Sequence, residues 1–228
     1  MQKKILAING SPRKYWNTYQ LCESALKGAS SIGAETELIQ LCDIKFSGCM
    51  SCYVCHKKGM RKEFDCFYKD ALSPLLKKCL QADAIIVGSP IYYGDITGTV
   101  HNFLERLLFP IDTYAIEKGV RLKKLDKVIP SALIFTMNAN EKQAKDMKKI
   151  LQHDVDCMNH LLGYCESLYS FDTYQFSNYE EYDANLFDEK HKLELNKKQF
   201  PLDLEKAYGL GKRLIIKADE LNDKRRVL

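Results

Sequence analysis

The sequence has no long apolar run and no excess of one charge sign. No stretch approaches the roughly 18 apolar residues of a membrane-spanning helix, and the run ILAI before Asn9 is too short for the core of a signal peptide. The 34 basic and 30 acidic residues are mixed along the chain and leave a formal net charge of +4. Nucleic-acid-binding proteins concentrate positive charge in a patch. We therefore expect a cytoplasmic protein that binds neither membrane nor nucleic acid.

Apolar, β-branched runs alternate with helical patterns along the chain. Strands are expected at residues 4–9, 37–41, 84–88, 132–136 and 166–171, and helices at residues 17–31, 69–81, 98–109, 141–161 and 201–221. Such alternation is typical of a doubly wound α/β fold with a mainly parallel sheet. The length of 228 residues suits a single domain, residues 1–228. A cysteine-rich insertion at about 44–68 and a C-terminal extension at about 174–228 lie outside the alternating pattern.

The segment GSPRKYWNT, residues 10–18, separates the first expected strand from its helix. It lies beyond the carboxyl end of the strand, where doubly wound sheets bind ligands. The helix N-terminus offers N–H groups and the positive end of its dipole to an anion. Ser11, Asn17 and Thr18 add side-chain donors and Arg13 adds a charge, so we expect a phosphate here.

Two common phosphate motifs are missing from this segment. Neither the P-loop pattern GxxxxGK[ST] nor the dinucleotide pattern GxGxxG is present, and GLGK at residues 209–212 follows no expected strand. A mononucleotide is therefore favoured over a dinucleotide. The alternative is that Gly10 and Pro12 only shape a turn while Asn17 or Thr18 caps the helix.

A second loop, SPIYYG at residues 89–94, follows the expected strand at 84–88. It would lie beside the first loop if the first and third strands are neighbours. Proline stiffens this loop, Tyr92 and Tyr93 offer faces to a planar ring, and Gly94 allows close backbone approach. A phosphate loop beside an aromatic loop suits flavin mononucleotide (FMN). Ordinary packing of the two tyrosines is an equally open alternative.

The two stretches INGSPRKYWNTYQL and GSPIYYGDITGTVHNFLER resemble the NAD(P)H-dependent FMN reductase family of flavodoxin-like proteins. The resemblance implies a five-stranded parallel sheet with helices on both faces and FMN at its carboxyl edge. It also implies a homodimer or homotetramer, and no catalytic side chain, because the flavin carries the chemistry. The implied FMN contacts are Ser11, Arg13, Asn17 and Thr18 at the phosphate, Pro90, Ile91, Tyr92, Tyr93 and Gly94 at the isoalloxazine ring, and Thr136 and Asn138 in a third loop.

Four of the nine cysteines form the pattern C-x2-C-x2-C-x10-C, with Cys49, Cys52, Cys55 and Cys66 as its members. Disulfides are rare in reducing compartments, so the cluster indicates metal or redox chemistry. Four thiolates could hold a [4Fe-4S] cluster, and the chain resembles iron-sulfur flavoproteins here, although its last gap is longer than in their motif. A zinc site that includes His56, a redox-active dithiol and reduced thiols in a packed loop are the open alternatives.

Three functions follow from these patterns. The leading one is an FMN-dependent oxidoreductase, in which NAD(P)H passes hydride to FMN and the electrons go on to a quinone, a flavin or another small acceptor. The second is an iron-sulfur flavoprotein that carries electrons from a redox protein such as a ferredoxin. The third is a flavodoxin-like scaffold whose cysteine loop is a zinc-stabilised interaction module.

Overall fold

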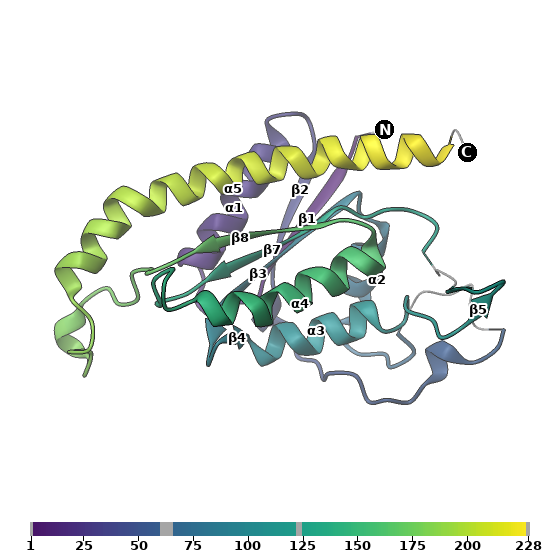
Figure 1. The fold of residues 1–228 in the computed structure, drawn as a ribbon, viewed down its shortest axis with the longest axis horizontal. Coiled ribbons are helices and arrows are strands. Elements are labelled where there is room, and N and C mark those ends of the chain that lie inside the picture. Colours follow the sequence, from purple (N-terminus) through teal and green to yellow (C-terminus); the bar gives the residue numbers. More distant parts are fainter. Residues whose placement is uncertain (1, 60–65, 122–124, 227–228) are drawn as a thin grey trace.

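The computed structural model describes residues 2–59, 66–121 and 125–226 (Figure 1). Its main sheet has the order β2-β1-β3-β7-β8, and all four neighbouring pairs are parallel. These strands are β1 (Lys4–Asn9), β2 (Glu35–Gln40), β3 (Ala84–Tyr92), β7 (Ser131–Thr136) and β8 (Cys165–Ser170). This is the flavodoxin-like order, so the expected α/β fold is confirmed.

Short strands complete the β structure. The strand β4 (Asp95–Ile96) pairs antiparallel with the end of β3, and β5 (Ile116–Glu117) pairs antiparallel with β6 (Val120–Arg121) in a separate hairpin. The cysteine-rich insertion expected at 44–68 includes residues 60–65, which lie outside the described residues.

Helices cover both faces of the main sheet (Figure 1). One face carries α1 (Asn17–Ser30) and α5 (Glu189–Arg226); the other carries α2 (Ser73–Gln81), α3 (Gly98–Leu108) and α4 (Lys145–Leu162). Side chains of β1 alternate between the two cores, with Leu6 and Ile8 on the α3 side and Ile5 and Ala7 on the α1 side. All four are fully buried, which explains why this strand is apolar throughout.

The helix α5 begins well before the expected residue 201. It starts at Glu189 and continues through Pro201. Proline is tolerated best at a helix start, which is why the sequence pattern favoured the later boundary. A Cβ atom on Gly211 would lie 1.8 Å from the carbonyl oxygen of Ala25, and one on Gly28 would lie 1.9 Å from that of Tyr208. The second glycine of GLGK therefore lets α5 and α1 pack backbone to backbone.

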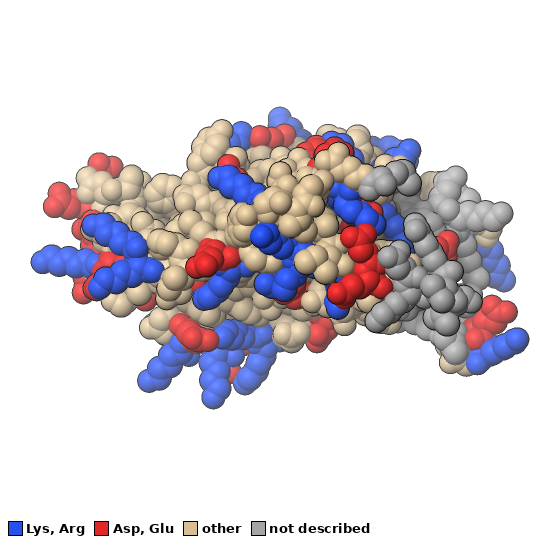
Figure 2. All heavy atoms as spheres, turned by 90° about the horizontal axis from the view of Figure 1, so that it is seen from above, with Lys and Arg blue, Asp and Glu red and all other residues tan. Residues whose placement is uncertain are grey.

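The surface carries mixed charge, as the sequence predicts. Figure 2 shows lysine and arginine side chains beside aspartate and glutamate side chains over the face it presents. Among the described helices, none is both long and apolar enough to cross a membrane.

Candidate functional site

Close backbone packing holds the expected phosphate loop against β3. The backbone N–H of Gly10 donates to the carbonyl oxygen of Gly88 at 2.8 Å. A Cβ atom on Gly10 would lie 2.1 Å from Val100 Cγ2, and one on Gly88 would lie 2.6 Å from Cys22 Sγ. Both glycines are therefore needed for close approach between β1, β3, α1 and α3.

The first turn of α1 is open to an anion. Trp16 is the N-cap and makes no side-chain cap hydrogen bond, so the alternative in which Asn17 or Thr18 caps the helix is wrong. The first turn contains no acidic residue. Because the first N–H groups of a helix have no acceptor within the helix and its dipole is positive at this end, this turn has the features of a phosphate site.

Four of the predicted FMN contacts are buried at this edge of the sheet: Ser11, Asn17, Thr18 and Thr136. Ser11 is 5% exposed, and its hydroxyl accepts a hydrogen bond from the backbone N–H of Arg13 at 3.1 Å. The hydroxyls of Thr18 and Thr136 lie 2.7 Å apart. The structure thus brings together the start of α1 and the end of β7, where the third predicted loop begins.

The segment that follows β8 crosses the phosphate loop. The Asn17 side-chain amide donates to the carbonyl oxygen of Tyr174 at 2.8 Å, and the Arg13 guanidinium donates to that of Gln175 at 2.5 Å. The guanidinium also lies 3.9 Å from the centroid of the Trp16 ring. A phosphate at this loop would compete with the two carbonyl oxygens for these donors.

The expected aromatic loop is an antiparallel hairpin. Instead of ending at Gly88, β3 continues to Tyr92, which pairs with Asp95 of β4. Tyr93 and Gly94 form the turn with φ angles of 53° and 87°, and two positive φ angles define a type I′ turn. Gly94 therefore serves the turn. The side chains of Tyr92 and Tyr93 are exposed, so their rings are available to a planar ligand.

The hairpin adjoins the third predicted loop. Pro90 and Ile91 are half-buried, and Pro90 pairs in register with Thr136 of β7. Within the described chain, the side-chain oxygen of Asn138 is buried and has no hydrogen-bond partner. An acceptor left in this state is costly unless a donor binds it. The N–H group of a flavin ring is such a donor, so the loop fits the predicted cofactor.

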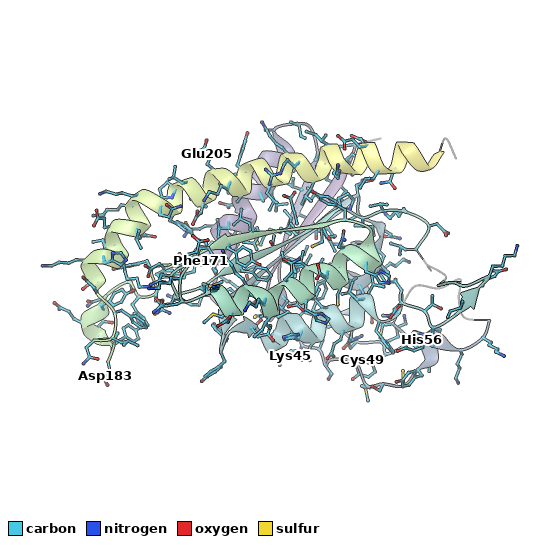
Figure 3. The ribbon with its side chains drawn as sticks, in the orientation of Figure 1. Lys45, Cys49, His56, Phe171, Asp183 and Glu205 are labelled. Atoms are coloured by element: carbon cyan, nitrogen blue, oxygen red, sulfur yellow. The ribbon has the colours of Figure 1, made fainter. Side chains whose placement is uncertain are left out.

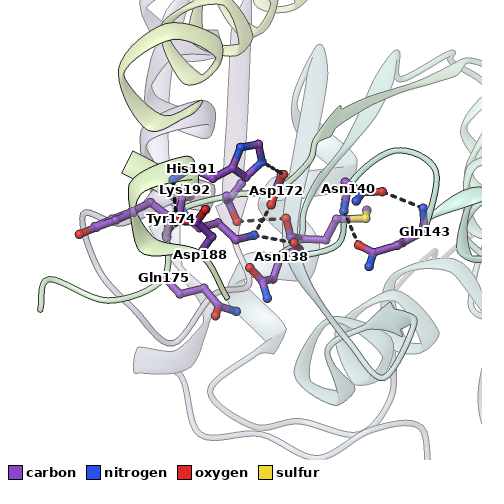
Figure 4. Close-up of polar contacts among 12 residues, drawn as sticks. Asn138, Asn140, Gln143, Asp172, Tyr174, Gln175, Asp188, His191 and Lys192 are labelled. Carbon is purple, nitrogen blue, oxygen red and sulfur yellow. Dashed lines mark hydrogen bonds and ion pairs between the residues drawn. The ribbon is translucent and has the colours of Figure 1, made fainter. Parts of the chain in front are cut away.

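A polar cluster that we did not predict fixes this loop to α5 (Figure 4). Lys192 is 4% exposed. Its ammonium donates to the Asp172 carboxylate and, at 2.8 Å, to the carbonyl oxygen of Asn138. His191 Nε2 lies 2.9 Å from the same carboxylate. Burial favours the neutral acid, but Lys192 and His191 outweigh it and hold the pKa of Asp172 below its ordinary value of 3.8.

The cysteine segment lies beside α3. Figure 3 shows Cys49 and His56 right of centre along the lower side of the molecule, with Asp183 at the lower left. Cys49, Cys52, Cys55 and Cys66 all line one cavity beside α3. Over the described residues, however, no three histidine, cysteine, aspartate or glutamate side chains are close enough to share a metal ion.

His56, which the zinc alternative would use as a ligand, does not line this cavity. Its ring stacks on Tyr114, with 5.1 Å between centroids and 16° between planes. No disulfide joins the described cysteines. Four thiols without a disulfide therefore line this cavity, but no three of them are close enough to share one metal ion.

The backbone around Cys52 is held in an unusual conformation. Ser51 and Tyr53 have φ angles of 50° and 55°, in the left-handed region that costs roughly 1–2 kcal/mol for a residue other than glycine. The backbone N–H of Cys49 donates to the Glu105 carboxylate at 3.0 Å. Strain that the surroundings impose in this way often accompanies a binding site.

The isolated cysteines are mostly unreactive. Burial raises the pKa of the Cys22, Cys79 and Cys165 thiols to about 12. Of the cysteines outside the cluster pattern, Cys22 and Cys79 are buried, Cys157 and Cys165 are half-buried and Cys42 is exposed.

Residues 3–123 match the sequence model of the NADPH-dependent FMN reductase family, which is more than half of the 228 residues. The chain belongs to this family. An iron-sulfur flavoprotein of Archaeoglobus fulgidus is 41% identical over 103 residues, which are 45% of this chain and 48% of that protein. An iron-sulfur flavoprotein of Methanocaldococcus jannaschii is 36% identical over 103 residues, 45% of this chain and 51% of that protein. The chain thus spans about half the length of these curated relatives.

A solved structure supports the fold independently. The NAD(P)H:quinone oxidoreductase of Methanothermobacter marburgensis aligns over 94% of this chain and 98% of its own, with a TM-score of 0.65 and 13% identity. At this identity the likeness bears on the fold alone.

Replacing Arg13 with alanine should weaken FMN binding about 10- to 100-fold, because a hydrogen bond to a charged group contributes roughly 1.5–3 kcal/mol. Titration of apoprotein with FMN, followed by flavin fluorescence, measures this. Lys14→Ala is the matched control, since Lys14 is the next residue, carries the same charge and pairs with Asp43 at 2.7 Å. Equal affinity of R13A and wild type would remove Arg13 from the site.

Replacing Tyr93 with asparagine removes the aromatic ring and keeps the turn. Asn-Gly is the preferred type I′ pair, so the hairpin should be kept. Loss of stacking on a planar ring should weaken FMN binding by roughly 1–3 kcal/mol. Tyr93→Phe, which keeps the ring, should bind FMN as wild type does in the same titration. If Y93N also binds FMN normally, Tyr93 does not contact the flavin.

Proposed function

We propose that this chain is an FMN-dependent electron-transfer protein whose cysteine segment holds a [4Fe-4S] cluster. The observation that carries the proposal is that Cys49, Cys52, Cys55 and Cys66 line a single cavity. From the sequence, the ten-residue gap before Cys66 left it open whether Cys66 is the fourth cluster ligand. The names of the two relatives, both iron-sulfur flavoproteins, support the same conclusion.

The flavin half of the proposal rests on the carboxyl edge of the sheet. Bound FMN would supply both one- and two-electron chemistry. The uncapped first turn of α1 and Arg13 would hold its phosphate, the exposed rings of Tyr92 and Tyr93 would contact the isoalloxazine, and Asn138 would accept a hydrogen bond from the ring. A homodimer or homotetramer, and a redox protein as electron donor, belong to the same proposal.

The cluster half rests on the four thiols. A bound cluster would supply one-electron transfer, and its potential would depend on the charges and hydrogen bonds around its sulfurs. Because thiols bind metals as thiolates, loading would release protons. The thiols would also have to move inward, since those described do not yet converge on one point.

The first test is the visible spectrum of protein purified without air, with iron and zinc measured on the same sample. We expect flavin bands on a broad absorbance that dithionite bleaches, and about four iron atoms per chain. Cys52→Ser should lose the iron and keep the FMN, whereas Cys42→Ser, the exposed isolated cysteine, should keep both. Flavin without iron would leave an FMN reductase with a thiol loop, and zinc in a colourless protein would support the interaction module.

A second candidate is the NAD(P)H-dependent reductase, which the exposed tyrosines of the hairpin favour because they leave the predicted ring site accessible. Steady-state oxidation of NADH and of NADPH with a quinone acceptor separates the two functions. An electron carrier should turn over well below about 1 per second, the lower end of ordinary enzyme rates. Faster oxidation that persists in Cys52→Ser would show that the flavin works as a reductase without the cluster.

A further inference from the structure

Arg106 is a buried arginine of α3 that the flavin site does not use. The residue is 1% exposed. Its guanidinium donates to the carbonyl oxygen of Ser47 at 3.1 Å, to that of Tyr68 at 2.6 Å and to the Asp70 carboxylate at 2.5 Å. A buried arginine with this many contacts fixes the geometry of whatever it binds, because its donors form a rigid planar fork.

The two carbonyl groups mark the ends of the cysteine segment. Ser47 is two residues before Cys49, and Tyr68 is two residues after Cys66. One guanidinium therefore sets the separation between the stretch that carries three of the cysteines and the stretch that carries the fourth. Loss of this contact would let the two stretches part.

One donor of Arg106 is still unused. Its Nε–H group is buried and has no hydrogen-bond partner within the described chain. Arg106 lines the same cavity as the four cysteines. A buried N–H group without a partner carries a free-energy cost, which an anionic sulfur in the cavity would remove.

The ionisable groups around the cavity are mostly acidic, so the positive charge of Arg106 would favour binding of a cluster. Four thiolates around a cluster form an anionic group, and Asp70 and Glu105 add two carboxylates close to it. Of the described residues that line the cavity, Arg106 is the only arginine or lysine. It therefore offsets negative charge that would otherwise oppose both cluster binding and the addition of an electron.

We propose that Arg106 is the positioning residue of the cysteine site: it joins the two ends of the segment into one ligand set and donates its Nε–H to the sulfur ligands. The inference rests on the cluster proposed above. On this basis Arg106 increases the affinity for the cluster and raises its reduction potential, because a nearby cation stabilises the reduced, more negative state.

The test uses the full chain, reconstituted without air, and three variants. Arg106→Gln should bind the cluster about tenfold or more less tightly, as is typical when the group that orients a metal ligand is lost, and its remaining cluster should have a lower reduction potential. Arg106→Lys should keep the potential near that of wild type but lose iron, since an ammonium cannot reproduce the fork. Asp70→Asn should shift the potential the opposite way, to a higher value, because it removes a negative charge.

The readouts are iron and sulfide per chain after chelator challenge, and the potential from a dithionite titration followed by electron paramagnetic resonance. Arg213→Gln is the matched control, because Arg213 pairs with Glu166 in an exposed position on α5 and should change neither quantity. If Arg106→Gln does not fold, the opposite shift in Asp70→Asn and the iron loss in Arg106→Lys decide the question.

The outcomes separate this inference from the proposed function. Wild-type protein without iron would overturn both. Wild-type protein with iron, together with Arg106 variants that keep the same iron content and potential, would overturn the role of Arg106 alone. Unchanged FMN content in every variant would show that the effects arise at the cysteine site.

Discussion

The burial of the parallel sheet on both faces is the constraint on which the rest of the structure depends. Every side chain from Ile5 to Ile8 is fully buried, so the body of β1 has no surface on which to build a site. Polar chemistry is therefore confined to strand ends, and because the strands are parallel, the loops after them meet at one edge. The contacts of Gly10 with Gly88 and of Thr18 with Thr136 are direct results of this arrangement.

This constraint explains which parts of the molecule could be predicted from the sequence. Apolar β-branched runs bounded by glycine locate buried strands, and the strand order then brings the predicted phosphate and aromatic loops together. The hairpin at Tyr93 and Gly94 was missed because Tyr-Gly is a weaker turn signal than Asn-Gly. The contacts of Arg13 and Asn17 with the segment after β8 were also missed, since their acceptors are backbone carbonyl groups, which every residue carries.

The two buried ion pairs show a further limit. Asp172 and Lys192 come from a loop and a helix start that form no motif, so nothing in the sequence joins them. Arg106 did leave a signal: it follows Phe103 by three residues on an amphipathic helix, and both side chains are fully buried. A cation at a position with the helical spacing of the core needs a partner. The sequence alone could have predicted that Arg106 has a buried partner, but only the fold identifies Asp70 and the cysteine segment as its partners.

The helix α3 connects the two candidate sites physically. Its start is fixed beside the hairpin, where the backbone N–H of Thr97 donates to the Ser89 hydroxyl at 3.0 Å. From Gly98 to Arg106 the helix rises about 12 Å, and Arg106 then holds the cysteine segment. Val100 and Phe103 between them are fully buried, so α3 cannot shift without disrupting the core. The separation between the carboxyl edge of the sheet and the cysteine cavity within one chain is therefore set by one rigid helix rather than by the loops at either place.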